Sequence, residues 1–411
     1  MNAQRSGFVC RGWAQLSVTL VLTACLALRA GDAHAGSAQA LSPRVYQQLT
    51  EVQGLMEQSN YADAERRLRG MLDEWTQGGY AQAIGLQMLA QAQAARQRYP
   101  QAAQSLATSI ALEALPEETQ QQARYDLAQL YLAAGSPAQA VAVLETWFEQ
   151  ATQPPAGAYF LLGTAYLQDR AYRKAIKPLR RAIETSQSSD ETWYQTLLAA
   201  HYELSDYAAC AEVLEQMLRL FPERDYWQQL SGIYLALHRD EKALSVLELA
   251  YRQRRLQREP ELMQLVQLYL ARDIPIKAAR LLEAEMLDQR VADDAANLEL
   301  LAGAWAQARE RSKAIDSYRR ALHAGADGRL ALIIGELYIE DERWQEAATV
   351  LETTLQRHRP GAPADAWLLL GVARYEEGDL AAARAAFEEA ARHDNTRTAA
   401  EQWLEHLAAR L

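Results

Sequence analysis

Histidine and cysteine are the residues of this chain that could carry metal or nucleophilic chemistry, and neither type clusters. The chain has 7 histidines and 3 cysteines in 411 residues. No H-E-x-x-H, C-x-x-C or G-x-S-x-G motif, phosphate-binding loop or calcium loop occurs. Most histidines stand singly, and we expect each of these to be a surface or helix-end residue: His201, His238, His323, His358, His393 and His406.

The remaining candidates for chemistry also have simple structural explanations. Carboxylate pairs such as Asp293–Asp294 and Glu388–Glu389 are typical of solvated helix faces. Cys210 occupies a position that is otherwise alanine in a repeated pattern, where we expect a buried thiol that fills space. The sequence therefore predicts no enzyme, no cofactor and no metal site.

The repeated pattern describes the elements of the fold. The stretch YWQQLSGIYLALHRDEKALSVLELA, residues 226–250, reads as two short amphipathic helices separated by a turn. The same template returns upstream and downstream. Its second-helix alanine slot recurs every 33 to 38 residues, at Ala64, Ala102, Ala140, Ala175, Cys210, Ala243, Ala278, Ala314, Ala347 and Ala383.

This period and spacing resemble the tetratricopeptide repeat over about nine tenths of the chain. We therefore predict an all-α fold, an α-solenoid in which about ten helix-turn-helix repeats form a right-handed superhelix closed by a C-terminal capping helix. Small residues should let the two helices of a hairpin approach closely, at Gly163, Ser231, Ala302, Gly335 and Gly371. Bulky residues should oppose them, at Leu179, Leu247, Leu282, Tyr318, Leu351 and Phe387. Gly135 and Gly378 mark turns.

The amino-terminal segment predicts export. Arg5 and Arg11 precede the apolar run LSVTLVLTACLAL, and small residues follow at Ala33 and Ala35. We assign residues 1–35 to a cleaved signal peptide, 36–43 to a flexible linker, 44–396 to the superhelix and 397–411 to the capping helix. The alternative is a lipoprotein, because LTAC matches a lipoprotein processing box with Cys25 as the acylated residue.

The charge balance excludes one class of partner. The formal net charge is -11. Such a chain repels phosphate backbones, so we expect no nucleic-acid partner. We expect contact with a membrane only through partners or through acylation of Cys25.

Without catalytic motifs, the function should lie in a binding surface. The first helices of stacked hairpins line a concave groove suited to a peptide or a partner helix. We predict an apolar, amide-rich lining formed by Tyr125, Gln129, Leu132, Phe160, Thr164, Leu167, Gln195, Tyr202, Gln228, Leu235, Met263, Gln267 and Leu270. The alternative is that Leu132, Leu167, Leu235 and Leu270 pack between adjacent repeats.

Two basic stretches stand out against this acidic background. One second helix carries a candidate docking patch of Arg173, Lys174, Lys177, Arg180 and Arg181, and a second stretch, RQRRLQR, spans residues 252–258. Each is either a docking site for an acidic partner or anionic headgroups, or a solvated outer face.

Several stretches resemble a narrower family. LETWFEQATQPPAGAYFLLGTAYLQ, YWQQLSGIYLAL, LYLARDIPIKAARLLE and WAQARERSKAID are similar to exported tetratricopeptide proteins found with the TonB, ExbB and ExbD energy-transduction components of Gram-negative bacteria. The resemblance implies a periplasmic accessory scaffold with TonB-type partners that supports uptake of iron chelates or similar nutrients. The alternatives are an outer-membrane lipoprotein scaffold for secretion or surface-polymer assembly, and a regulator of a cell-wall enzyme.

Overall fold

The computed structural model describes residues 41–75, 79–188, 190–223, 225–356 and 364–408, and these residues form helices and connecting turns with no strand among them. The chain divides into two compact units, Met1–Pro222 and Glu223–Leu411. The predicted signal peptide, Cys25 and most of the predicted linker lie outside the described residues. The all-α solenoid fold is confirmed by the helices and their order.

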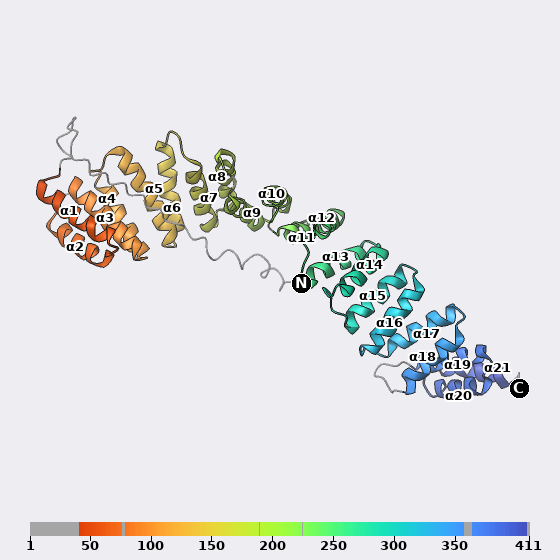
Figure 1. Cartoon of the computed structure of the whole chain (residues 1–411). Coiled ribbons are helices and arrows are strands. Elements are labelled where there is room, and N and C mark those ends of the chain that lie inside the picture. Colours follow the sequence, from red (N-terminus) through yellow and green to blue (C-terminus); the bar gives the residue numbers. More distant parts are fainter. Residues whose placement is uncertain (1–40, 76–78, 189, 224, 357–363, 409–411) are drawn as a thin grey trace. The chain divides into compact units, whose positions relative to one another are not determined.

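The first unit consists of successive antiparallel helical hairpins, which Figure 1 shows following one another in chain order from α1 to α10. Its helices are α1 (Pro43–Glu57), α2 (Tyr61–Glu74), α3 (Tyr80–Ala95), α4 (Tyr99–Ala111), α5 (Glu117–Ala133), α6 (Pro137–Gln150), α7 (Ala156–Gln168), α8 (Tyr172–Thr185), α9 (Glu191–Glu203) and α10 (Tyr207–Leu220).

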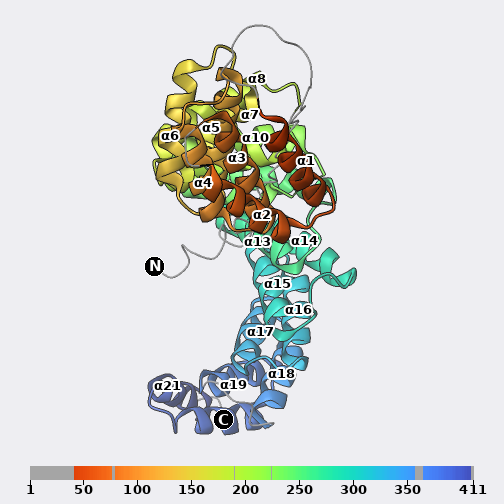
Figure 2. The same ribbon diagram turned by 90° about the vertical axis from the view of Figure 1, so that its left-hand side faces the viewer.

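The second unit continues the same pattern, as the view from another side also shows for α13 to α18 (Figure 2). Its helices are α11 (Trp227–Ala236), α12 (Asp240–Arg252), α13 (Glu259–Ala271), α14 (Pro275–Leu287), α15 (Ala295–Gln307), α16 (Arg311–His323), α17 (Arg329–Glu340), α18 (Trp344–Gln356), α19 (Asp365–Glu377), α20 (Leu380–Ala390) and α21 (Arg397–Ala408).

Glycines let the two helices of a hairpin approach each other where the sequence predicts it. A Cβ added to Gly163 of α7 would lie 2.5 Å from Cγ of Leu179 on α8. A Cβ on Gly335 of α17 would lie 3.0 Å from Leu351 on α18. Because real Cβ atoms do not approach other carbons so closely, only glycine allows these helix pairs to pack at this distance.

The turns inside the hairpins use left-handed backbone at residues that the sequence did not mark. Gly135 and Gly378 have φ of 71° and 91°, as expected for turn glycines. Non-glycine residues at the same place in other hairpins also have positive φ: Arg170, Ser205, His238, Asp273, Arg309 and Glu342. Each such residue costs roughly 1 kcal/mol, which the packing of the flanking helices offsets.

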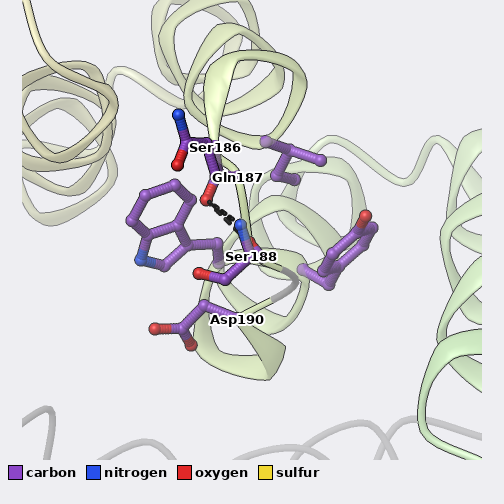
Figure 3. A pocket seen from close by; sticks show the side chains of 7 residues that line it. Ser186, Gln187, Ser188 and Asp190 are labelled. Carbon is purple, nitrogen blue, oxygen red and sulfur yellow. Dashed lines mark hydrogen bonds between the residues drawn. The ribbon is translucent and has the colours of Figure 1, made fainter.

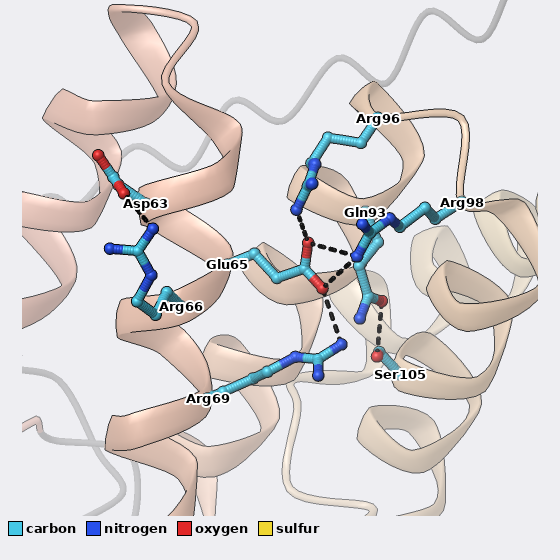
Figure 4. Close-up of polar contacts among 8 residues, drawn as sticks. All are labelled: Asp63, Glu65, Arg66, Arg69, Gln93, Arg96, Arg98 and Ser105. Carbon is cyan, nitrogen blue, oxygen red and sulfur yellow. Dashed lines mark hydrogen bonds and ion pairs between the residues drawn. The ribbon is translucent and has the colours of Figure 1, made fainter.

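A buried carboxylate ties the first two hairpins together (Figure 4). Glu65 of α2 is only 3 % exposed. It pairs with Arg69 at 2.7 Å, with Arg98 at 3.4 Å and also with Arg96. Because a buried charge is costly unless it is paired, these arginines hold the turn between α3 and α4 against α2.

Successive hairpins are also joined by a polar link that recurs along the chain. The Tyr166 hydroxyl on α7 donates to Glu145 on α6 at 2.5 Å, and the Lys174 ammonium lies 5.5 Å from the Tyr166 ring centroid. In the second unit the Tyr269 hydroxyl donates to Glu248 on α12 at 2.7 Å. Burial is the main cause that raises the pKa of Tyr166, to about 12, and the adjacent Glu145 adds to it.

The last helix closes the second unit. Trp403 of α21 stacks on Phe387 of α20, with ring centroids 5.3 Å apart and planes 7° apart. Leu407 of α21 is buried in the same cluster. A closing helix of this kind covers the apolar face that the last hairpin would otherwise expose. Among the described helices, none combines the length and the apolar character needed to span a bilayer.

Candidate protein-binding surface

Six half-buried aromatic residues gather in the first unit, and we call this surface the aromatic edge: Tyr125, Trp147, Phe148, Tyr159, Phe160 and Trp193. Four of them form a chain of contacts. The ring centroids are 5.6 Å apart for Tyr125–Trp147, 5.1 Å for Trp147–Phe148 and 5.0 Å for Phe148–Tyr159. The other two, Phe160 and Trp193, stack at 5.1 Å with planes 14° apart.

The rings meet because of where they lie on their helices. Trp147 and Phe148 are near the end of α6, whereas Tyr159 and Trp193 lie near the starts of α7 and α9. Most of the aromatic edge therefore follows the ends of the hairpins, where one second helix passes into the next first helix, and Tyr125 joins it from the middle of α5. The indole of Trp147 donates to the Gln121 carbonyl at 3.0 Å, which fixes the ring against α5.

A small pocket adjoins the aromatic edge where α8 ends and α9 begins (Figure 3). Its volume is about 70 Å³, and it is lined by Ile183, Ser186, Gln187, Ser188, Asp190, Trp193 and Tyr194. The Ser186 hydroxyl donates to the Ser188 carbonyl at 2.6 Å, and the Asp190 carboxylate accepts from the Thr192 amide at 2.8 Å. Trp193 is thus shared between the pocket and the stacked pair.

One titratable group lies beside these rings. Burial raises the pKa of Asp126 to about 6, and a hydrogen bond from Gln122 at 2.9 Å opposes this rise. Burial also raises the pKa of the neighbouring Tyr125 phenol. The carboxyl of Asp126 therefore changes charge within the physiological range, next to the aromatic edge.

The structure brings only some of the predicted groove residues together. Tyr125 and Phe160 belong to the aromatic edge, whereas Gln195 lies two residues after Trp193 on α9 and therefore on another side of that helix. Leu132 and Thr164 are 5 % and 4 % exposed, so they lie in the core and cannot line a binding surface. For Leu132, burial agrees with the alternative that it packs between repeats.

The remaining predicted groove residues are divided between the two units, and one of them, Gln129, hydrogen-bonds Tyr125 of the aromatic edge. Gln129, Leu167 and Tyr202 are half-buried in the first unit, and Tyr202 contacts Tyr207 at a centroid distance of 6.0 Å. Five others belong to the second unit, where Gln267 is exposed and the rest are half-buried: Gln228, Leu235, Met263, Gln267 and Leu270.

The two basic stretches differ in their surroundings. All five residues of the predicted docking patch on α8 are exposed. In the second stretch Arg255 pairs with Glu223 at 3.1 Å, and Arg258 contacts Glu261. Local carboxylates therefore neutralise part of the second stretch, while α8 keeps most of its charge.

Four rings of the aromatic edge are absent from the predicted groove: Trp147, Phe148, Tyr159 and Trp193. The groove was predicted on one face of the first helices, and Trp147 and Phe148 lie on a second helix. The adjacent aromatic residues in TWF, residues 146–148, and TWY, residues 192–194, were the available signal.

Cys210 is buried, as predicted, and burial raises the pKa of its thiol to about 12, so it is not a reactive nucleophile. His201 lies in the last turn of α9 and is 2 % exposed, so of the two predicted alternatives, surface residue or helix-end residue, it is the second. Within the described ranges, no group of three or more histidine, cysteine, aspartate or glutamate side chains is placed to hold a metal ion.

Comparison with known proteins identifies the repeats. The tetratricopeptide repeat family matches residues 125–190 and 334–401, and the first of these segments includes most of the aromatic edge and all of α8. None of the curated proteins compared with the chain matches it. One segment of each unit is therefore similar to tetratricopeptide repeats.

Solved structures of repeat proteins are similar to the chain at low identity. MamA (41-end) from Desulfovibrio magneticus RS-1 is 20% identical, with a TM-score of 0.38, and the match covers 45% of this chain and 99% of that one. A tetratricopeptide repeat protein from Parabacteroides merdae ATCC 43184 is 13% identical, with a TM-score of 0.39, and the match covers 72% and 98%. The TPR2AB domain of yeast Sti1, in a complex with pHSP90, is 15% identical, with a TM-score of 0.32, and the match covers 69% and 99%.

Proposed function

Because the chain carries tetratricopeptide repeats, we propose that it is a non-catalytic scaffold that binds a protein partner along the aromatic edge. The observation that carries this proposal is the run of half-buried rings at the ends of three successive hairpins, with contacts of 5.0 to 5.6 Å. Tryptophan and tyrosine supply most of the energy of protein interfaces, because they bury a large area at a low entropic cost.

The pocket beside Trp193 fits the same proposal. Pockets for whole small molecules usually measure roughly 300–1,000 Å³. The volume here is about 70 Å³, which suits part of one side chain from a partner. Its hydroxyl and carboxylate groups, from Ser186 and Asp190, offer hydrogen bonds to the partner's backbone.

The cellular setting of the scaffold is also part of the proposal. We place the mature protein in the periplasm as an accessory of a TonB-type energy-transduction system for uptake of iron chelates or similar nutrients. The support is the export pattern of residues 1–35 and the resemblance of four stretches to exported proteins of such systems. Mass spectrometry of the mature amino terminus tests the export step, since cleavage after Ala35 and acylation of Cys25 give different masses.

Cross-linking from the aromatic edge tests the scaffold function. A photo-activatable amino acid at Phe160 or Trp193 should capture one or a few defined proteins in intact cells grown under iron limitation. Trp193→Ala should weaken capture from Phe160 at least about tenfold, the usual effect of truncating an interface hot spot. Trp344→Ala is the matched control, because Trp344 is another half-buried tryptophan but lies in the second unit.

The identity of the captured proteins distinguishes the scaffold function from its assignment to a TonB-type system. Capture of a TonB, ExbB or ExbD component supports the complete proposal. Capture of other proteins that depends on Trp193 would retain the scaffold and reject the TonB setting. Equal capture by wild type and Trp193→Ala would reject the aromatic edge as the binding surface.

A further inference from the structure

Helix α8 carries an unusual charge on its outer side, and we call this surface the basic face: Arg173, Lys177, Arg180 and Arg181. These residues are spaced four, three and one apart, so they lie along one side of the helix. All four are exposed. The ion pair between Arg181 and Glu184, at 3.7 Å between two exposed side chains, is weak. Within the described residues, no ion pair joins Arg173, Lys177 or Arg180 to a carboxylate.

The position of Arg180 carries a glutamate in most of the other second helices, although Arg69 and Arg319 also place an arginine there. Six other second helices carry glutamate five residues after the alanine slot, at Glu145, Glu215, Glu248, Glu283, Glu352 and Glu388. Three of these glutamates bond to the next first helix. Glu145 accepts from Tyr166, Glu248 accepts from Tyr269, and Glu352 pairs with Arg374 at 2.6 Å.

In α8 both partners of this link are replaced. Arg180 takes the place of the glutamate, and His201, the residue 21 positions later, takes the place of the tyrosine. Within the described residues Nε2 of His201 has no hydrogen-bond partner. Burial lowers the pKa of His201, and the charge of Arg180 makes a smaller contribution in the same direction. Nδ1 of His201 lies 3.1 Å from Asp206, so the imidazole is held by its own turn rather than by α8. The carboxylate that most repeats provide at this position is therefore absent.

The flanking helices limit what can approach the basic face. On one side, α6 exposes Glu145 and Glu149 and contains no lysine or arginine. On the other side, α10 exposes Glu212, and this carboxylate and Arg180 both act on the pKa of His201. The basic face thus lies on one helix, and the second helices before and after it expose three carboxylates, although α10 also exposes Arg219 near its end. A flat anionic membrane would meet these glutamates as well as the cations, whereas a narrow acidic chain would meet only the cations.

We propose that the basic face docks an acidic segment of a protein partner, in which carboxylates are spaced three and four residues apart on one side of a helix. This proposal rests on the scaffold function proposed above and assigns that scaffold a second contact surface. The partner's carboxylates supply the negative charge that α8 lacks at the position of Arg180. Exposed arginines suit this role because each guanidinium can bind a carboxylate in a bidentate manner.

A binding measurement with a defined probe tests the proposal. The probe is a fluorescent amphipathic helical peptide with glutamates spaced three and four residues apart, and its control has glutamine at the same positions. The full chain should bind the glutamate peptide but not the glutamine peptide, and the affinity should fall as salt is added. The triple variant Arg173→Glu, Lys177→Glu, Arg180→Glu should bind at least about tenfold more weakly. The triple glutamine variant should give an intermediate loss.

A matched variant distinguishes the effect of the basic face on peptide binding from the effect of net charge. Arg309→Glu, Arg319→Glu and Arg384→Glu change three exposed arginines of the second unit and alter the net charge by the same amount. This control should bind the peptide within about twofold of wild type. Equal loss in both triple variants would overturn the proposal, because the effect would then be one of net charge. Circular dichroism spectra identical to wild type should accompany each variant, since every altered side chain is exposed.

A vesicle assay distinguishes an acidic protein segment from an anionic membrane as the partner. Phosphatidylglycerol vesicles that retain wild type but not the α8 variant, combined with no peptide binding, would overturn the proposal in favour of a membrane contact. Loss of peptide binding in the α8 variant with unchanged cross-linking from Phe160 would show that the basic face and the aromatic edge act separately. Failure of the peptide to bind wild type would reject the basic face and leave the aromatic edge to its own test.

Discussion

Replacing Gly371 with alanine should destabilise the carboxyl-terminal hairpin through one added methyl group. A Cβ at this position on α19 would lie 2.5 Å from Cδ1 and 2.8 Å from Cζ of Phe387 on α20. The Phe387 ring is fully buried and stacks on Trp403 of α21. The ring therefore cannot move away from α19 without disturbing the closing helix.

The expected magnitude follows from two opposing effects. Alanine is a better helix former than glycine by about 1 kcal/mol, which favours the variant. Overpacking a close contact in a core typically costs about 1–3 kcal/mol, and the stacked ring places this site near the upper end of that range. We expect Gly371→Ala to lower the free energy of unfolding by about 1–2 kcal/mol.

A control in the same unit isolates the steric effect. Gly232 lies inside α11, is exposed, and a Cβ added there meets nothing within 4 Å. Gly232→Ala should therefore raise the free energy of unfolding by about 0.5–1 kcal/mol, through helix propensity alone. Urea unfolding followed by circular dichroism compares the two variants. Hydrogen exchange of α19, α20 and α21 locates the effect of Gly371→Ala, which should speed exchange in these helices.

The sign of the change in unfolding free energy shows whether the added methyl group at Gly371 clashes. If Gly371→Ala stabilises the protein as much as Gly232→Ala does, the close approach of α19 and α20 is not a packing constraint. Unchanged exchange in α21 would separately refute the argument that Phe387 transmits the strain to Trp403.

Three further changes test turns and titratable groups. Ser205→Gly should raise the free energy of unfolding, measured in urea, by about 0.5–1 kcal/mol, because Ser205 has φ of 56° in the turn before α10. A loss of stability would contradict the left-handed turn. Asp126→Asn should remove a pH dependence of stability that wild type shows. Since the folded pKa of Asp126 is raised from 3.8 to about 6, its contribution to stability is present below pH 4 and lost as pH rises through 6. Thermal unfolding of both proteins from pH 4 to 7 checks this sign. Tyr166→Phe should cost about 1 kcal/mol at pH 7, because the hydrogen bond to Glu145 is lost. It should also reduce the loss of stability at alkaline pH, because the raised pKa of the phenol makes its contribution complete below pH 10 and lost as pH rises through 12. An alkaline pH dependence that is the same in wild type and variant would contradict the raised pKa.

The sequence predicted the core of each hairpin from spacing alone. Gly163 and Leu179 each fall on the buried side of an amphipathic helix, and they meet because a helix repeats its side-chain directions at fixed intervals. The thiol of Cys210 was predicted to be buried for the same reason. Such contacts lie within one hairpin, where the chain itself sets which residues face each other.

The candidate site could be predicted only in part. Tyr125 and Phe160 were identified because they lie on first helices, but their neighbours Trp147 and Trp193 were not. Leu132 and Thr164 belong to the same predicted groove as Tyr125 and Phe160, yet they are buried. How far a neighbouring hairpin covers a given face depends on packing between repeats, which no period in the sequence records.

The sequence by itself determined the helices, their pairing into hairpins and the repeat that joins them, because these depend on local spacing and on which side of each helix is apolar. Only the tertiary structure decided which aromatic side chains meet at the ends of the hairpins, which turn residues adopt left-handed backbone, and which charges remain without a partner. Arg180 shows the difference: the sequence gives its charge and the glutamates that six other second helices have at this position, but only the structure shows that three of those glutamates bond to the next first helix. These features depend on contacts between residues far apart in the chain, so packing determines them.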